Sequence, residues 1–169
     1  MKHLIIISVI LLTSAFTYGQ ARKKADKDTE HWRYELEVVN EGAQGTYLIK
    51  IWSYSRKPQV ALEQAKKNAI HGIVFKGYTG AGRIKGQKPL VKDPSAELTH
   101  EAFFKELFAD NGKYMKYVQL TTDGAIAPGD IMKVGKREYK VGIVVAVSKD
   151  ELRKYLEAEK IINSLSSGF

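Results

Sequence analysis

Apolar and charged side chains alternate in two neighbouring stretches of the first third of the chain. In the first stretch, residues 31–39 (HWRYELEVV), the apolar positions are Trp32, Tyr34, Leu36 and Val38. The second stretch, residues 46–55 (TYLIKIWSYS), is rich in β-branched and aromatic residues and follows the turn-forming segment NEGAQG. Alternation indicates half-buried strands, and two such runs joined by a short turn predict an antiparallel hairpin.

A spacing of four residues replaces the alternation in residues 57–75. Alanines recur at Ala61, Ala65 and Ala69, and Pro58 falls in the first turn, where a helix does not use the backbone N–H that proline lacks. The spacing predicts a helix whose small side chains allow it to lie close against the sheet. The side chains that we expect to face water are Glu63, Gln64, Lys67 and His71.

The second half of the chain carries two further helical patterns and two strand patterns. Residues 99–112 predict a helix with Thr99 as its N-cap and Asn111-Gly112 at its end. Residues 113–122 and 137–148 predict strands, and the nearly continuous β-branched run of the latter favours a central position in the sheet, covered on both faces. A final helix is expected after Ser148, which would cap it together with Glu151.

These elements follow the order β-β-α-loop-α-β-β-α. Since strands and helices are mixed rather than strictly alternating, we predict an α+β fold. In this fold the alanine-ridged helix and the C-terminal helix pack on an antiparallel sheet. Residues 31–165 are expected to form one domain, because their number suffices for a single hydrophobic core.

The first 19 residues have the pattern of an export signal. Lys2 precedes the apolar core LIIISVILLTSAF, and the small residue Gly19 stands at a suitable cleavage point. The core is shorter than the roughly 20 residues that a membrane-spanning helix needs. We therefore expect cleavage, a mature chain without a transmembrane anchor, and a periplasmic or secreted location. A flexible polar leader is expected over residues 20–30 and a frayed tail over residues 166–169.

The composition narrows the chemistry and the choice of partner. The chain has no cysteine, which excludes disulfides and thiol chemistry. Its formal net charge of +8 falls to +7 when Lys2 is removed with the signal, and a basic surface attracts anions. For an exported protein the candidates are anionic envelope polymers, lipid headgroups or an acidic partner. We expect an envelope protein or an anionic envelope polymer, and no nucleic acid. The alternative is that the surface is basic only by composition, and that its positive charge serves solubility and binds no particular partner.

The stretch GYTGAGRIKG, residues 77–86, has the glycine content of a phosphate-binding loop. A dinucleotide-binding loop or a P-loop must lead into a helix, and Gln87-Lys88-Pro89 does not open one. We interpret the stretch as a connecting loop that holds no cofactor, with Gly77 ending the preceding helix. No acidic residue occurs in this region before Asp93. The candidate contacts for a partner or an anion are Lys76, Arg83, Lys85 and Lys88.

Catalytic and metal-binding motifs are incomplete. HEAFF begins like the zinc motif H-E-x-x-H, but Phe104 occupies the position of the second histidine. No serine lies in a G-x-S-x-G motif. His31, His71 and His100 are scattered along the chain and are expected to be exposed. The sequence therefore predicts no catalytic residue, no cofactor and no metal site.

Aromatic residues gather in the predicted hairpin. Such rings can stack on sugars or bases when Lys or Arg lies beside them, and packing in the core explains them equally. In the second strand, Trp52 and Tyr54 fall on the face opposite Ile49 and Ile51. One face can thus be covered by a helix and the other by a partner, which makes Trp52 and Tyr54 candidate contacts.

The alanine ridge of residues 61–69 and the later run YKVGIVVAVSKDELRKYLE resemble a known group of exported domains. The group comprises the N-terminal domain of flagellar assembly protein T and related small envelope lipoproteins. The resemblance covers residues 45–162 and implies an alanine-ridged helix on an antiparallel sheet, with a late strand running into a final helix. It also implies a structural or assembly role without catalysis. Unlike the lipoproteins, this chain has no cysteine.

The sequence thus favours an exported binding or structural protein of a bacterial cell envelope. Its contact surfaces would be the basic glycine-rich loop and the aromatic hairpin. The alternative is an envelope hydrolase whose site is assembled only in the fold. That alternative predicts a deep pocket with at least two titratable groups in it.

Overall fold

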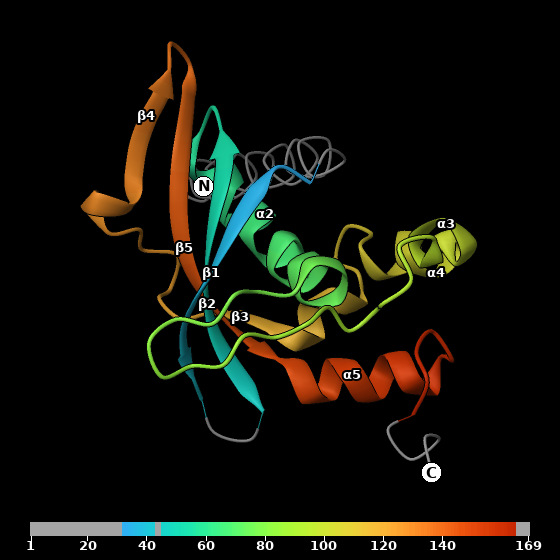
Figure 1. Ribbon diagram of the computed structural model, residues 1–169. Helices are drawn as coiled ribbons and strands as arrows, with labels where there is room; N and C mark the ends of the chain where they lie inside the picture. The colour runs from blue at the N-terminus through green and yellow to red at the C-terminus, as the bar shows by residue number, and fades with distance from the viewer. Residues whose placement is uncertain (1–31, 43–44, 165–169) are drawn as a thin grey trace, which may run out of the picture.

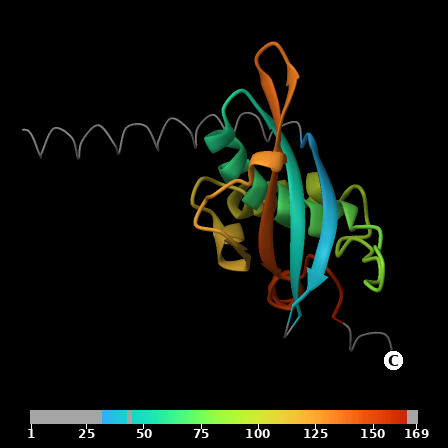
Figure 2. The same ribbon diagram turned by 90° about the vertical axis from the view of Figure 1, so that its left-hand side faces the viewer.

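Helices pack on one side of an antiparallel sheet in this computed structural model, which describes residues 32–42 and 45–164 (Figure 1). In the described part of the chain the sheet has five strands in the order β1-β2-β5-β3, and β4 also pairs with β5. Figure 2 faces the bare side of the sheet and shows α2 passing behind the strands. The predicted α+β fold class is confirmed. The predicted export signal (1–19), leader (20–30) and tail (166–169) lie outside the described residues.

The strands and helices have the following bounds. The strands are β1 (Tyr34–Glu41), β2 (Thr46–Ser55), β3 (Val118–Leu120), β4 (Ile131–Gly135) and β5 (Glu138–Ser148). The helices are α2 (Pro58–His71), α3 (Ala96–Thr99), α4 (Glu101–Leu107) and α5 (Lys149–Ala158). A π-helical turn, Gly72–Lys76, continues α2, and short 3-10 helices cover Lys113–Tyr117 and Pro128–Asp130.

Strand β5 lies in the middle of the sheet, as its β-branched run predicted. Its pairing with β2 is continuous from Thr46–Ser148 to Ser55–Tyr139. On its other side it pairs with β3 and β4. Every second side chain, including Val141 and Val145, is buried on the helix-covered face, whereas Val144 on the opposite face is only half-buried. The helices therefore cover one face of β5 and not both.

Helix α2 lies close against the sheet because its contact ridge consists of alanines. Ala61, Ala65 and Ala69 are all fully buried, and α2 contacts both β2 and β5. Asn68 also donates a hydrogen bond from Nδ2 to Ser53 Oγ at 3.0 Å, which fixes the helix on the strand. The predicted role of the alanine ridge is confirmed.

The outer side of α2 differs from the prediction. Gln64, Lys67 and His71, which we expected to face water, are buried. The 3-10 helix at 113–117 packs on α2 near Lys67, whereas His71 is covered by Trp32, Tyr34 and Phe108. The ammonium group of Lys67 accordingly lies 5.8 Å from the ring centroid of Tyr114.

Four local predictions in the second half of the chain were wrong. The helix predicted over 99–112 does not reach Asn111-Gly112, since α4 ends at Leu107. Thr99 is the last residue of α3 rather than an N-cap, and its hydroxyl donates to the carbonyl of Ser95. The strand predicted over 113–122 shrinks to β3, because 113–117 form the 3-10 helix. Strand β4 was not predicted. The last helix does begin after Ser148, but the Ser148 side chain makes no cap hydrogen bond.

Candidate functional site

The glycine-rich stretch forms a short hairpin. Residues 77–89, here called the basic hairpin, turn back at Gly82, which has a φ of +59°. Tyr78 and Gln87 exchange backbone hydrogen bonds of 2.8 and 2.9 Å, and Ala81 pairs with Ile84 in the same way. No helix follows this turn, which agrees with our interpretation of the stretch as a connection and not a phosphate loop.

The base of the basic hairpin is fixed by Gly77 and by the return of the chain. Gly77 ends the π-helical turn, as predicted, with a φ of +66°, and a Cβ there would overlap the backbone of Gln87 and Pro89. Past the hairpin, the N–H groups of Leu90 and Val91 donate to the carbonyls of Ile73 and Val74 at 3.1 and 2.9 Å. The hairpin is thus anchored at its base, and its tip extends away from the body.

A groove of about 630 Å³ separates the basic hairpin from strand β1. Tyr34 and Leu36 of β1 line one side, and residues 76–79 and 86–89 line the other. Figure 2 shows the hairpin beside β1, at the edge of the sheet. Among the described residues, β1 pairs only with β2, and no backbone hydrogen bond crosses the groove. The outer edge of β1 therefore faces the groove with unpaired backbone groups.

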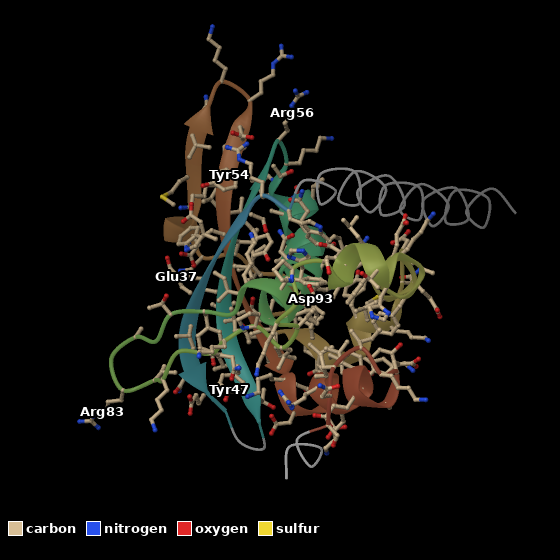
Figure 3. The ribbon with its side chains drawn as sticks, turned by 45° about the vertical axis from the view of Figure 1, so that its right-hand side comes forward. Glu37, Tyr47, Tyr54, Arg56, Arg83 and Asp93 are labelled. Carbon is tan, nitrogen blue, oxygen red and sulfur yellow. The ribbon has the colours of Figure 1, made fainter. Side chains whose placement is uncertain are left out.

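Two of the predicted contact residues, Lys76 and Lys88, line this groove. The Lys76 ammonium lies 3.8 Å from the ring centroid of Tyr34 and donates to the Trp32 carbonyl at 3.4 Å. Partial burial lowers the pKa of Lys76 from its ordinary value. Arg83 and Lys85 are exposed in the distal half of the hairpin, and Figure 3 shows Arg83 pointing away from the body. The structure therefore gathers two of the four basic candidates at the groove.

The aromatic candidates lie elsewhere, on the bare face of the sheet. There, cations and rings alternate in a row that we call the cation–aromatic ladder: Arg33, Tyr54, Lys140, Trp52 and Lys50. The distances from each cation to a neighbouring ring centroid are 4.1 Å for Arg33–Tyr54, 5.1 Å for Lys140–Trp52 and 4.7 Å for Lys50–Trp52. Lys140 also lies 5.9 Å from the ring of Tyr54.

Carboxylates satisfy the polar groups of this ladder. Glu35 accepts hydrogen bonds of 2.6 Å from both Lys140 and the Tyr54 hydroxyl, and these bonds hold the pKa of Glu35 below its usual range. Glu37 accepts from Trp52 Nε1 at 3.0 Å. The Trp52 ring also covers Gly142, where an added Cβ would lie 2.7 Å from its Cζ3 atom. A ligand that stacked on Trp52 would have to replace these internal contacts. The polar and aromatic groups of the ladder therefore already have partners within the protein.

Behind the groove wall, Tyr34 and His71 form a buried hydrogen bond. The Tyr34 hydroxyl and His71 Nδ1 share a hydrogen bond of 2.7 Å, and the Trp32 ring stacks on His71 with 3.7 Å between the ring centroids. His71 is 5% exposed. Burial and then the charge of Lys76 lower the pKa of His71 to about 3, so the imidazole is neutral at pH 7. Burial and then the nearby Glu97 raise the pKa of Tyr34.

This pair is poorly tuned for proton transfer. A general base works best when its pKa lies near the working pH, and that of His71 lies far below it. The pair was not predicted from the sequence, and His71 was expected on an exposed helix face. A side-chain contact between residues 34 and 71, which are 37 positions apart, cannot be inferred from local periodicity.

Comparisons with known proteins add no relative: no protein-family model, no curated protein and no solved structure matches this chain. The resemblance to flagellar assembly protein T therefore stays a prediction. Within residues 32–42 and 45–164, no group of three or more His, Cys, Asp or Glu side chains could hold a metal ion. None of the helices in that part of the chain is long and apolar enough to cross a membrane.

The two positive-φ glycines of the basic hairpin should respond differently to alanine. At Gly82 an added Cβ meets nothing within 4 Å, so Gly82→Ala should cost about 1 kcal/mol of left-handed backbone strain. At Gly77 the methyl group would also overlap backbone, so Gly77→Ala should lower the free energy of unfolding by about 3 kcal/mol or more. Denaturant unfolding measures both variants. Equal losses would contradict the packed base of the hairpin.

The buried His71 should make the protein sensitive to acid. The unfolded chain binds the histidine proton near pH 6.5, whereas the folded chain binds it only near pH 3. The stabilisation is therefore complete above about pH 6.5 and is lost as the pH falls toward 3. The slope should reach about 1.4 kcal/mol per pH unit between these values.

Urea unfolding at a series of pH values tests this dependence. His71→Gln, whose amide can still form a hydrogen bond with the Tyr34 hydroxyl, should remove that part of the slope. His100→Gln removes a half-exposed histidine and should keep the wild-type profile. A His71→Gln variant with the wild-type pH dependence would contradict the neutral, buried state of the imidazole.

Proposed function

We propose that this chain is an exported, non-catalytic binding protein of a bacterial cell envelope, which holds an extended segment of an acidic partner protein in the groove beside β1. One observation carries the proposal: the groove joins an unpaired strand edge to a basic hairpin. The export signal predicted over residues 1–19 supports the location.

The strand edge favours an extended polypeptide as the occupant. On an antiparallel edge strand, every second residue turns both its N–H and its C=O outward. Such an edge can accept an added strand through main-chain hydrogen bonds, while side-chain pockets select the sequence. Tyr34 and Leu36 provide the apolar part of such a pocket, and Thr79 and Gln87 provide polar groups opposite them.

The charge of the groove favours acidic side chains on that segment. Lys76 and Lys88 line the groove, and the sequence from residue 76 to residue 92 contains no acidic residue. Partial burial makes the positive form of Lys76 less favourable, and a carboxylate beside it would offset that cost. An anionic polysaccharide would supply the charge but not the backbone groups that pair with β1.

A hydrolase is the second candidate, because titratable groups meet at the groove wall. Tyr34 and Lys76 line the groove and His71 lies directly behind Tyr34. The directions of the pKa shifts of His71 and Tyr34 oppose a role in proton transfer at neutral pH. If the protein were a hydrolase, Tyr34→Phe would abolish its activity, whereas partner binding would persist.

Photo-crosslinking from the groove tests the proposal. A photoreactive side chain replaces Thr79, which lines the groove, and a matched one replaces the exposed Thr121 near the opposite edge of the sheet. Each protein is mixed with an envelope extract and its adducts are sequenced. We expect a defined adduct from position 79 alone, joined to a segment rich in Asp and Glu. Equal adducts from both positions would contradict the proposal.

Competition then locates the charges. Unlabelled wild-type chain that is added before irradiation should suppress formation of the adduct, whereas the Lys76→Gln/Lys88→Gln variant should need about tenfold more protein for the same suppression, because two cations at the groove are lost. Arg83→Gln/Lys85→Gln removes the same charge from the distal half of the hairpin and should compete like the wild type. Equal competition by both double variants would show that the groove charges do not select the partner.

A further inference from the structure

The β4–β5 hairpin projects from the body of the protein at the edge of the sheet away from β1 (Figure 1). Strand β2 pairs with β5 only as far as Tyr139, so the tip of the hairpin extends beyond its neighbour. All residues from 131 to 137 are exposed. This edge lies across the sheet from the groove, and both could be occupied at once.

The hairpin concentrates the exposed apolar side chains of the described structure. The described part of the chain exposes five large hydrophobic residues, and three of these lie in β4. Their exposed fractions are 37% for Ile131, 39% for Met132 and 48% for Val134. Single exposed apolar side chains are common on protein surfaces, but a cluster of them indicates a contact surface.

The same hairpin carries uncompensated positive charge. Lys133, Lys136 and Arg137 occur in a segment without acidic residues. The acidic residues that flank the segment are already engaged: Asp130 pairs with Lys50 at 2.5 Å, and Glu138 pairs with Arg33 at 2.9 Å. Three cations therefore stand beside the apolar side chains with no carboxylate partner in the described structure.

The exposed apolar side chains of β4 lie on both of its faces. Met132 pairs with Lys140 and so lies on the bare face of the sheet, whereas Ile131 pairs with the buried Val141 and Lys133 with Tyr139 on the other face. A protein partner would meet one of these faces, but a fluid interface surrounds an inserted tip on both. An apolar tip with cations around it fits the boundary between headgroups and acyl chains of an anionic bilayer.

We propose that the β4–β5 hairpin docks on an anionic phospholipid bilayer, with Met132 and Val134 entering the headgroup region and the three cations binding lipid phosphates. The inference does not rest on the partner groove, because no residue is shared between the two surfaces. It places the sheet edge that carries β4 on a membrane surface.

A single fluorescent label tests the insertion, since the chain has no cysteine of its own. Val134→Cys and Val39→Cys give two labelling sites of matched exposure, 48% and 47%. Each full-length variant carries an environment-sensitive dye and is mixed with vesicles of phosphatidylglycerol and phosphatidylcholine. We expect a blue shift, and quenching by brominated acyl chains, at position 134 and not at position 39. Because the readout is local, binding through another part of the chain does not imitate it.

Neutral substitutions test the charges. Lys133→Gln/Lys136→Gln/Arg137→Gln should weaken co-sedimentation with these vesicles by about tenfold to a hundredfold. Arg83→Gln/Lys85→Gln/Lys92→Gln removes the same charge from exposed positions outside both the groove and the β4–β5 hairpin and should bind as the wild type does. The proposal is overturned if the dye at position 134 stays unshifted, if both dyes shift alike, or if the two triple variants lose the same affinity. Unshifted dyes would point to an acidic protein as the occupant instead.

Discussion

The reversal of the chain at Gly77 is the constraint on which the groove depends. The π-helical turn brings the end of α2 to the edge of the sheet, and there the backbone passes so close to Gln87 and Pro89 that no side chain fits. The returning chain is then fixed by the hydrogen bonds of Leu90 and Val91 to the same turn. Because both ends are anchored on α2, and α2 is anchored on the sheet by its alanines, the hairpin stands at a defined distance from β1.

The two faces of the sheet are completed by different physical means. On one face, helices bury the alternate side chains of β2 and β5 in an apolar core. On the other face, the cation–aromatic ladder covers the strands, and the short 3-10 helix Pro128–Asp130 contacts it through the ion pair between Asp130 and Lys50. The Trp52 ring packs on the backbone of Gly142, and the cations of the ladder lie against its aromatic rings. Glu35 and Glu37 accept hydrogen bonds from Lys140, Tyr54 and Trp52, so these polar groups have partners. This arrangement leaves the edges, rather than the faces, as the surfaces open to other molecules.

The parts of the fold that follow from local periodicity could be predicted. Alternation identified β1 and β2, the four-residue spacing of alanines identified the contact ridge of α2, and the β-branched run identified the central strand. Gly77 was identifiable as a helix terminator because a glycine follows the last apolar residues of the helical pattern. Strand β4 escaped prediction because IMKVG follows Pro-Gly-Asp and is too short to show alternation clearly.

The site could be predicted only in part, because it depends on contacts between distant segments. Lys76 and Lys88 were identified from charge alone, but their position opposite β1 follows from the anchoring of the hairpin. The burial of Gln64, Lys67 and His71 could not be foreseen, since an amphipathic pattern assumes one buried face, whereas the 3-10 helix at 113–117 also packs on α2 and Trp32 stacks on His71. The partners of Trp52 and Tyr54 depend on the register of strands β1, β2 and β5.

Hydrogen exchange at β1 tests most directly whether this strand edge is the binding surface. The account predicts that, in the free protein, amides of β1 that bond to β2 exchange slowly while the alternate, outward-facing amides exchange fast. When the acidic partner segment saturates the groove, the outward-facing amides should become protected, while those at the tip of the basic hairpin stay as they were. Outward-facing amides that are already protected in the free protein, or that still exchange fast in the saturated complex, would contradict the account.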